Sequence, residues 1–247
     1  MQAILIFLTA AVATFLSSMS GGGSSIIALP VFLSMGITFP LATAMQKISA
    51  CFWVPSSAFN YLKGKKIDWP FLIIFSLIGL VGVYLGVLVV IGVNQNILKR
   101  VVGLFIIFLV IYISLKKSVG LSEKPARSKF KETLAYIIAL PMGFYESLLG
   151  SGNGIAFSAI TFYAKGFDFI DALGYYFAVA VPWVILAAII FIQKGFFSWS
   201  LVIPATLGSF VGGYCGSKLA RFKGNRFIKV VFAIVGGFLG IKLIIGF

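Results

Sequence analysis

Long apolar runs separated by short polar segments dominate the chain, and this pattern predicts membrane-spanning helices. The run Phe71–Val93, for example, contains no charged side chain. About 20 such residues in a helix cross the roughly 30 Å of hydrocarbon in a bilayer. We therefore predict full-length helices over residues 39–62, 67–93, 97–115, 168–193, 197–220 and 226–246.

Four shorter apolar pieces flank two glycine-rich clusters. They cover residues 3–18, 25–35, 133–149 and 155–164. At about 1.5 Å per residue they fall short of a full crossing, so we predict pairs of half-helices that meet inside the membrane. Each pair is either a re-entrant hairpin or one broken span, and a third option is that both pieces cross a locally thinned bilayer.

The two halves of the chain are related by an internal repeat with an offset of 130 positions. The offset pairs two tryptophans with the other two, and these four are all that the chain contains. Such self-similarity is typical of duplicated transporters. The aligned pairs include Ser17 with Ser147, Gly22 with Gly152, Trp53 with Trp183, Trp69 with Trp199, Gly82 with Gly212 and Gly86 with Gly216. We predict a first transmembrane repeat over residues 1–116, a linker over 117–131 and a second repeat over 132–247.

Basic residues between the apolar runs favour an inverted relation between the repeats. If each half crosses an odd number of times, one membrane face collects the basic residues of 63–66, of the linker region and of 218–229. The other face then keeps Lys99, Arg100 and Lys194. Lysine and arginine concentrate on the cytoplasmic side of membrane proteins. We therefore predict an all-α polytopic membrane protein of two inverted-topology repeats and about ten helical segments, with a cytoplasmic linker and both termini outside.

Composition narrows the function further. The chain is 60% hydrophobic and only 11% charged, so it needs lipid as its solvent. Its net charge of +14 comes with no nucleic-acid-binding motif, and we expect no nucleic-acid partner. Histidine is absent, which removes His-based catalysis and His-ligated metals. We expect no enzyme activity, no cofactor and no metal; the oligomeric state is left open, with a homodimer as one option.

The glycine clusters are the first candidate for a binding site. Each cluster precedes a half-helix, whose free backbone N–H groups and positive dipole end attract anions. The alternative is that the glycines only allow close helix packing. The flanking polar side chains favour the site, because they cost free energy in lipid unless they are satisfied. The predicted substrate-binding residues here are Ser20, Gly21, Gly22, Gly23, Ser24, Ser25, Gly150, Ser151, Gly152, Asn153 and Gly154.

Two charged residues inside predicted helices complete this site. Lys47, next to Gln46, lies deep in helix 39–62, where an ammonium costs about 2.5–3.5 kcal/mol on insertion scales. It either binds the anion, together with Gln46, or extends towards the nearer surface. Glu146 is the acidic residue placed within a membrane segment, and it is either a proton-coupling group or the counter-ion of Lys47. Trp53 and Trp183 are candidates for the wall of the substrate pathway, with packing as the equal alternative.

These motifs resemble a known family of membrane transporters. The segments SxxSGGGSSIIALPVFLSMG, GSGNGIAFSAITFYAKG, IDWPF and FSWSL are similar to those of the sulfite exporter family TauE/SafE, also called TSUP. The resemblance covers essentially the whole chain and implies a transporter of sulfite, thiosulfate, sulfoacetate or a related organosulfonate or organic anion in the bacterial cytoplasmic membrane. We predict alternating-access transport, with a channel-like anion facilitator as the alternative. A serine-nucleophile enzyme built on Ser20, Ser24 or Ser25 is disfavoured, because no third group orients a base.

Overall fold

The computed structural model describes residues 2–90, 129–148 and 150–245, together with residues 104, 107, 108, 111 and 115. Most of the predicted helix over 97–115 and most of the predicted linker lie outside the described residues. The described part is helical, with short connections and no strand. Its helices are α1 (Gln2–Ser20), α2 (Ser24–Ser34), α3 (Phe39–Leu62), α4 (Trp69–Val90), α6 (Lys129–Leu148), α7 (Asn153–Lys165), α8 (Phe169–Gln193), α9 (Trp199–Lys223) and α10 (Asn225–Ile245).

Within each predicted half-helix pair, the first helix is longer than the second. Helices α2 and α7 have 11 and 13 residues, about 17–20 Å, which is short of a crossing as predicted. Helices α1 and α6 have 19 and 20 residues, longer than predicted. Helix α6 begins at Lys129, inside the predicted linker, because no glycine or proline stands between Pro125 and Pro141 to end it. Among the described residues, α1, α4 and α8 are long and apolar enough to cross a membrane by length and composition.

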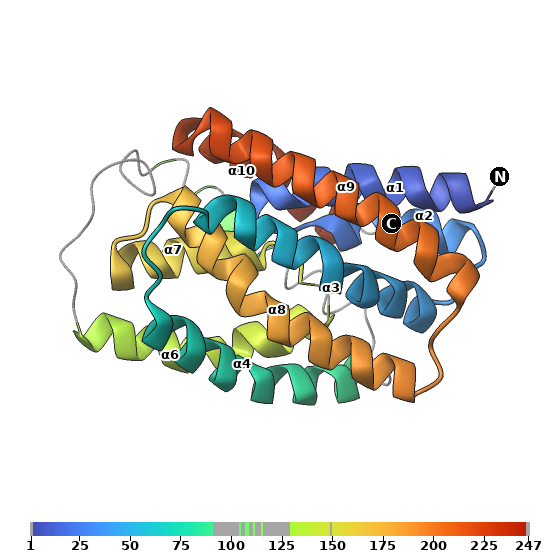
Figure 1. Cartoon of the computed structure of the whole chain (residues 1–247), viewed down its shortest axis with the longest axis horizontal. Helices are drawn as coiled ribbons and strands as arrows, with labels where there is room; N and C mark the ends of the chain where they lie inside the picture. Colours follow the sequence, from blue (N-terminus) through green and yellow to red (C-terminus); the bar gives the residue numbers. More distant parts are fainter. Residues whose placement is uncertain are drawn as a thin grey trace.

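The two repeats run in opposite directions. In Figure 1, α1 begins and α2 ends at the right-hand end of the bundle, whereas the α6–α7 hairpin enters from the left. Helix α3 joins α4 at the left end, and its counterpart α8 joins α9 at the right end (Figure 1). Each pair is therefore a hairpin rather than one broken span. The chain is a polytopic all-α membrane protein whose repeats are inverted, as the basic residues predicted.

Each repeat packs its hairpin against the other repeat. Helix α1 lies along α9, helix α6 lies along α4, and α3 crosses α8 at the centre. Glycines permit these contacts: a methyl group on Gly82 would overlap the backbone carbonyl of Leu140, and one on Gly212 would overlap that of Ala11. Small residues commonly let helices approach closely in membranes. Gly82 and Gly212, which are equivalent in the repeat, therefore allow close packing at two equivalent interfaces, α4 with α6 and α9 with α1.

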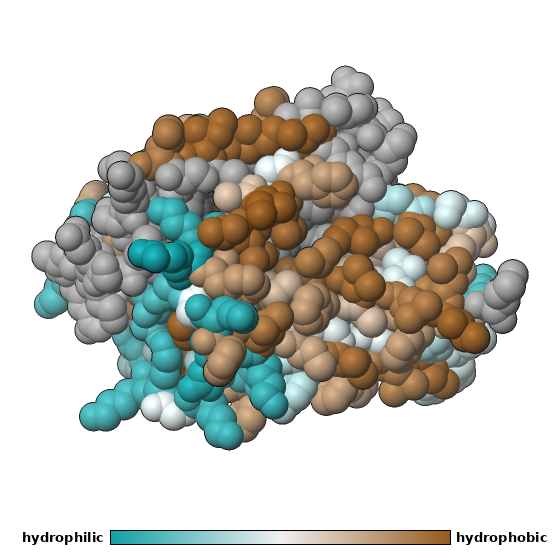
Figure 2. All heavy atoms as spheres, turned by 90° about the horizontal axis from the view of Figure 1, so that it is seen from above, coloured by the Kyte–Doolittle hydropathy of each residue, from teal (hydrophilic) through white to brown (hydrophobic). Residues whose placement is uncertain are grey.

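Charged residues gather at one end of the bundle. Figure 2 shows hydrophilic side chains at the left end of the visible face, where α3 joins α4, and mainly hydrophobic ones elsewhere. At this end Lys65 pairs with Asp171. Nζ of the buried Lys165 lies 2.7 Å from both Asp68 Oδ2 and Glu132 Oε1. These ion pairs join the α3–α4 connection of the first repeat to α6, α7 and α8 of the second.

Candidate functional site

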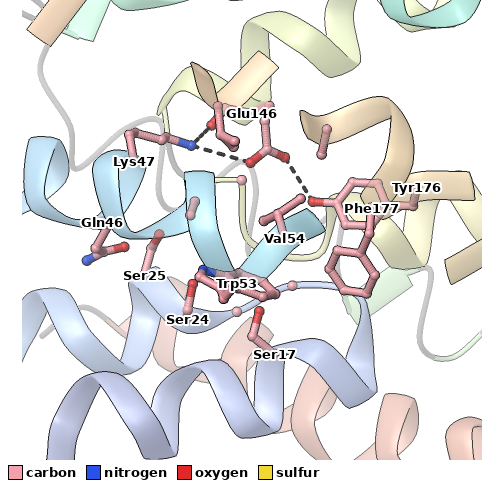
Figure 3. Close-up of a pocket in the computed structure, with 16 residues that line it drawn as sticks. Ser17, Ser24, Ser25, Gln46, Lys47, Trp53, Val54, Glu146, Tyr176 and Phe177 are labelled. Carbon is pink, nitrogen blue, oxygen red and sulfur yellow. Dashed lines mark hydrogen bonds and ion pairs between the residues drawn. The ribbon is translucent and has the colours of Figure 1, made fainter. Parts of the chain in front are cut away.

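A small cavity lies at the centre of the bundle, where the tips of both hairpins meet α3 and α8 (Figure 3). Its volume is about 40 Å³. The lining comes from α1, α2, α3, α6, α8 and both glycine clusters. It comprises Ser17, Gly22, Gly23, Ser24, Ser25, Gln46, Lys47, Ala50, Trp53, Val54, Glu146, Gly150, Tyr176, Phe177, Ala180 and Val184.

The cavity lies where equivalent positions of the two repeats face each other. Helix α3 contributes four residues whose partners at the 130-residue offset, on α8, line the same cavity. These pairs are Gln46 with Tyr176, Lys47 with Phe177, Ala50 with Ala180, and Val54 with Val184. The small aliphatic pairs keep the repeat symmetry, whereas the first two pairs break it. Of these four pairs, only the pair of Lys47 with Phe177 carries a charge, and the charged member is on α3.

Lys47 is buried and pairs with Glu146. Its side chain is 7% exposed, and Nζ lies 3.3 Å from Oε1 of Glu146. Nζ also donates to the backbone carbonyl of Glu146, and both interactions appear as dashed lines in Figure 3. The ammonium therefore does not extend to either membrane surface, which was one alternative for this residue. A buried ion pair needs such added hydrogen bonds to offset the loss of hydration.

The carboxylate of Glu146 is held by two further donors. The Tyr176 hydroxyl and the Asn153 side-chain amide each donate to Oε2, both at 2.9 Å. Sequence reasoning missed Tyr176; the available signal was its alignment with Gln46 in the repeat. With Lys47 on Oε1, both carboxylate oxygens have partners from three different helices. Charge-assisted hydrogen bonds of this kind are the stronger ones in proteins, so Glu146 fixes the relative positions of α3, α7 and α8.

The first glycine cluster presents a helix N-terminus to the cavity. Gly23 precedes α2 with φ 125°, a conformation that favours glycine, and it offers no side chain to cap the helix. Among the described residues, no backbone carbonyl accepts from the amides of Ser24 or Ser25. Both serines line the cavity. These first-turn amides therefore stay available to an anion.

The second cluster is arranged differently, which corrects the expectation of two equivalent helix N-termini. The amide of Gly154 donates to the carbonyl of Gly21 at 2.7 Å, and that of Asn153 donates to the carbonyl of Gly150 at 3.3 Å. The hairpin tips touch so closely that a methyl group on Gly154 would overlap Gly21. The α7 N-terminus is thus occupied by the opposite hairpin. Six predicted site residues stand outside the cavity lining for this reason: Ser20, Gly21, Ser151, Gly152, Asn153 and Gly154.

Two buried polar atoms in the lining have no hydrogen-bond partner in the described part of the chain. They are the hydroxyl of Ser17, whose residue is 1% exposed, and Nε2 of Gln46. Leaving a buried donor unsatisfied costs roughly 1–3 kcal/mol. Together with the amides of α2 and the ammonium of Lys47, they are hydrogen-bond donors on residues that line one small cavity. Such a set suits an anion or water.

The two tryptophans have different positions. Trp53 lines the cavity and packs edge-on against Phe177, with 5.5 Å between ring centroids. Trp183 lies outside the lining, and its indole N–H donates to the carbonyl of Ser76 on α4 at 2.9 Å. Trp183 therefore has the packing position that the sequence left open, although its sequence context matches that of Trp53.

Comparisons with known proteins agree with this architecture. A family model described as "Sulfite exporter TauE/SafE" matches residues 6–243. A "Probable membrane transporter protein ORF9" from Sinorhizobium sp is 28% identical, covering 97% of this chain and 91% of the relative. The "Probable membrane transporter protein YfcA" of Escherichia coli strain K12 is 25% identical, covering 97% of this chain and 88% of the relative. A "Probable membrane transporter protein" from Xylella fastidiosa is 23% identical, covering 90% and 87%.

Proposed function

We propose that this chain, which belongs to the sulfite exporter TauE/SafE family, is a secondary transporter that moves a small anion across the bacterial cytoplasmic membrane by alternating access. The observation that supports this most strongly is the set of unused donors around one buried lysine. Lys47, the first-turn amides of α2 and the free Gln46 amide all line one central cavity. Discontinuous helices with their N-termini at the midplane bind anionic groups in other inverted-repeat transporters.

The proposed cargo is sulfite, thiosulfate, sulfoacetate or a related organosulfonate or organic anion. The family description supports the sulfur oxyanions. Oxygen atoms around sulfur would accept from Lys47 and from the amides of Ser24 and Ser25, because charge-assisted N–H···O bonds suit such oxyanions. The adjoining face of the cavity, formed by Val54, Ala180 and Phe177, suits a short carbon chain.

Alternating access fits the position of the cavity and the inversion of the repeats. The cavity lies between the two repeats, and both of them contribute to its lining. Because the repeats are inverted, the first repeat can open in one direction as the second opens in the other, with the site between them.

Glu146 is the proposed coupling group. An anion that binds Lys47 competes with this carboxylate for the same ammonium, so anion binding is linked to the charge on Glu146. Glu146→Gln keeps the shape and the hydrogen bonds to Tyr176 and Asn153 but has no ionisable group. We expect this variant to bind the anion and to lose any dependence of flux on a proton gradient. Unaltered dependence would refute coupling at this residue and leave the anion site standing.

A channel-like facilitator of the same fold is the second candidate, because converging donors also suit a pore. Counterflow separates the two. A carrier loaded with unlabelled anion accumulates labelled anion transiently and saturably, whereas a pore does not. The helix N-terminus at the cavity and the inverted repeats, which are features of alternating-access transporters, favour the carrier.

The direct test is flux of radiolabelled sulfite, thiosulfate and sulfoacetate into proteoliposomes for the wild type and for Lys47→Ala. We expect the wild type to transport at least one of the three anions. Lys47→Ala should abolish that flux, and Lys63→Ala, at the charged end of the bundle, is the control that should retain it. Equal flux in Lys47→Ala and the wild type would refute the site. Impermeant amine labelling of Lys65 and Lys223 from either side tests the proposed orientation, with both on the cytoplasmic face.

A further inference from the structure

A second, smaller cavity adjoins the central one on the side away from the charged end. Its volume is about 10 Å³, and it lies among α1, α2, α3 and α9. Three residues line both cavities and thus stand between them: Ser24, Gln46 and Trp53. Beyond these, the second cavity is lined by Phe32 and by small or hydroxylated residues, which include Thr14, Ser49, Ala205 and Ser209.

Three residues that carry hydroxyl groups line this cavity, and Thr14, Ser49 and Ser209 are each at most 4% exposed. The Thr14 hydroxyl reaches across to the carbonyl of Ser209 at 3.0 Å, and the Ser49 hydroxyl lies 3.3 Å from that of Thr206. Serine and threonine commonly form hydrogen bonds between helices in membranes, and here they also supply polar groups to a cavity. The three residues lie on three different helices around it.

The equivalent space in the other half of the molecule is filled with aromatic rings. At the 130-residue offset, Phe75 stands in place of Ala205 and Phe144 in place of Thr14. The ring of Phe75 lies 6.1 Å from that of Trp183, in a stacked arrangement, and 5.1 Å from that of Phe157. Phe75, Phe157 and Trp183 are all fully buried.

The two tryptophans account for this difference. The Trp183 ring lies directly over Gly79, where any side chain would overlap it. The residue equivalent to Gly79 is Ser209, and Trp53 lies instead against Gly213, four residues further along α9. Trp53 and Ser209 both line the second cavity, so a space remains between them at the position that Trp183 fills in the other repeat. An inverted repeat that was symmetric here would have either two polar cavities or two aromatic clusters.

We propose that the second cavity is the route by which the anion passes between the central site and the membrane face away from the charged end, with Ser24, Gln46 and Trp53 as its constriction. The cluster of Phe75, Phe157 and Trp183 closes the matching route to the charged face. This inference rests on the proposed transport function, because only a transporter would use the cavity as a route for the anion. The structure is thus the conformation shut towards the charged face, and solute from that face enters only after the aromatic cluster separates.

Cysteine accessibility tests the route without any transport measurement. Cys51 and Cys215 are first replaced by alanine, and single cysteines are then placed at Ser49 and Ser209, and at Val179, the repeat partner of Ser49. The probe is an impermeant cationic methanethiosulfonate added to one side of oriented vesicles. We expect Ser49→Cys and Ser209→Cys to react at least tenfold faster from the face away from the charged end than Val179→Cys does from that face.

Equal rates at Ser49→Cys and Val179→Cys would overturn the route, and so would faster reaction of Ser49→Cys from the charged face. Because these rates need no substrate, the result stands even if the tested anions are not transported. A second pair of variants follows from the repeat. Ala205→Phe should block flux, as its partner Phe75 closes the other side, whereas Phe75→Ala should create a leak of anions that does not saturate. Flux through Ala205→Phe at the wild-type rate would also refute the proposal; if this variant does not fold, the labelling rates decide alone.

Discussion

The ion pair between Lys47 and Glu146 separates stability from function in one set of variants. Lys47→Met leaves a carboxylate buried with no counter-ion, because Glu146 is only 8% exposed. Removing one partner of a buried pair costs about 3–5 kcal/mol, whereas replacing both partners is often neutral. We therefore expect Lys47→Met to unfold far more easily than the wild type. The double variant Lys47→Met with Glu146→Gln should recover most of that loss.

The expected size of the effect can be stated as a melting temperature. About 1 kcal/mol corresponds to roughly 2–4 °C in a chain of this size, so Lys47→Met should melt about 6–20 °C below the wild type. The double variant should melt within a few degrees of the wild type. The assay is thermal unfolding of purified protein in detergent, followed by the fluorescence of the buried tryptophans.

Repeating the assay with anion present tests function in the same samples. A ligand at about 100 times its Kd stabilises the folded state by about 2.7 kcal/mol. We expect sulfite, thiosulfate or sulfoacetate to raise the melting temperature of the wild type and not that of the double variant. If Lys47→Met had the same melting temperature as the wild type, Lys47 would not be a buried charge. If the anion still raised the melting temperature of the double variant, Lys47 would not be the residue that binds the anion.

Three further predictions follow from the packing. Tyr176→Phe removes a donor to the Glu146 carboxylate and should lower the unfolding free energy by about 1.5–3 kcal/mol. The control Tyr84→Phe, on the exposed face of α4, should leave the melting temperature unchanged. Equal effects of the two substitutions would contradict the hydrogen bond. Gly212→Ala should destabilise by about 1–3 kcal/mol, because its methyl group meets the Ala11 carbonyl; Gly237→Ala, with open space around it, should be neutral or slightly stabilising in unfolding experiments. Lys165→Met leaves Asp68 and Glu132 without their shared counter-ion and should lower the melting temperature. Adding Glu132→Gln should restore part of the lost melting temperature. No recovery would show that the lysine acts by packing alone.

Much of the fold follows from local sequence properties. Apolar runs end where charged or glycine-containing loops begin, so α3 has its predicted bounds of 39–62. The inversion of the repeats was also predictable, because lysine and arginine are unevenly distributed between loops. The start of α6 was predicted less well: charged residues at positions 129–132 suggested a linker, yet nothing there prevents the helix from continuing.

The site was predictable in its components and not in its asymmetry. Both glycine clusters precede a helix, and the sequence alone treats them alike. Their difference arises from the contact of Gly21 with Gly154, which are 133 residues apart. The partnership of Lys47 with Glu146 and the opposite positions of Trp53 and Trp183 also depend on long-range packing. No local pattern specifies which of two equivalent side chains fills a space.

Locating a bound anion tests the central claim most directly. Selenite has the charge and shape of sulfite and scatters anomalously, so crystals grown with it would show the selenium position. The account predicts an anomalous peak in the central cavity, within hydrogen-bonding reach of Lys47 Nζ and of the amides of Ser24 and Ser25, and its loss in Lys47→Met with Glu146→Gln. A peak at the N-terminus of α7, or one beside Lys47 that persists in the double variant, would contradict it.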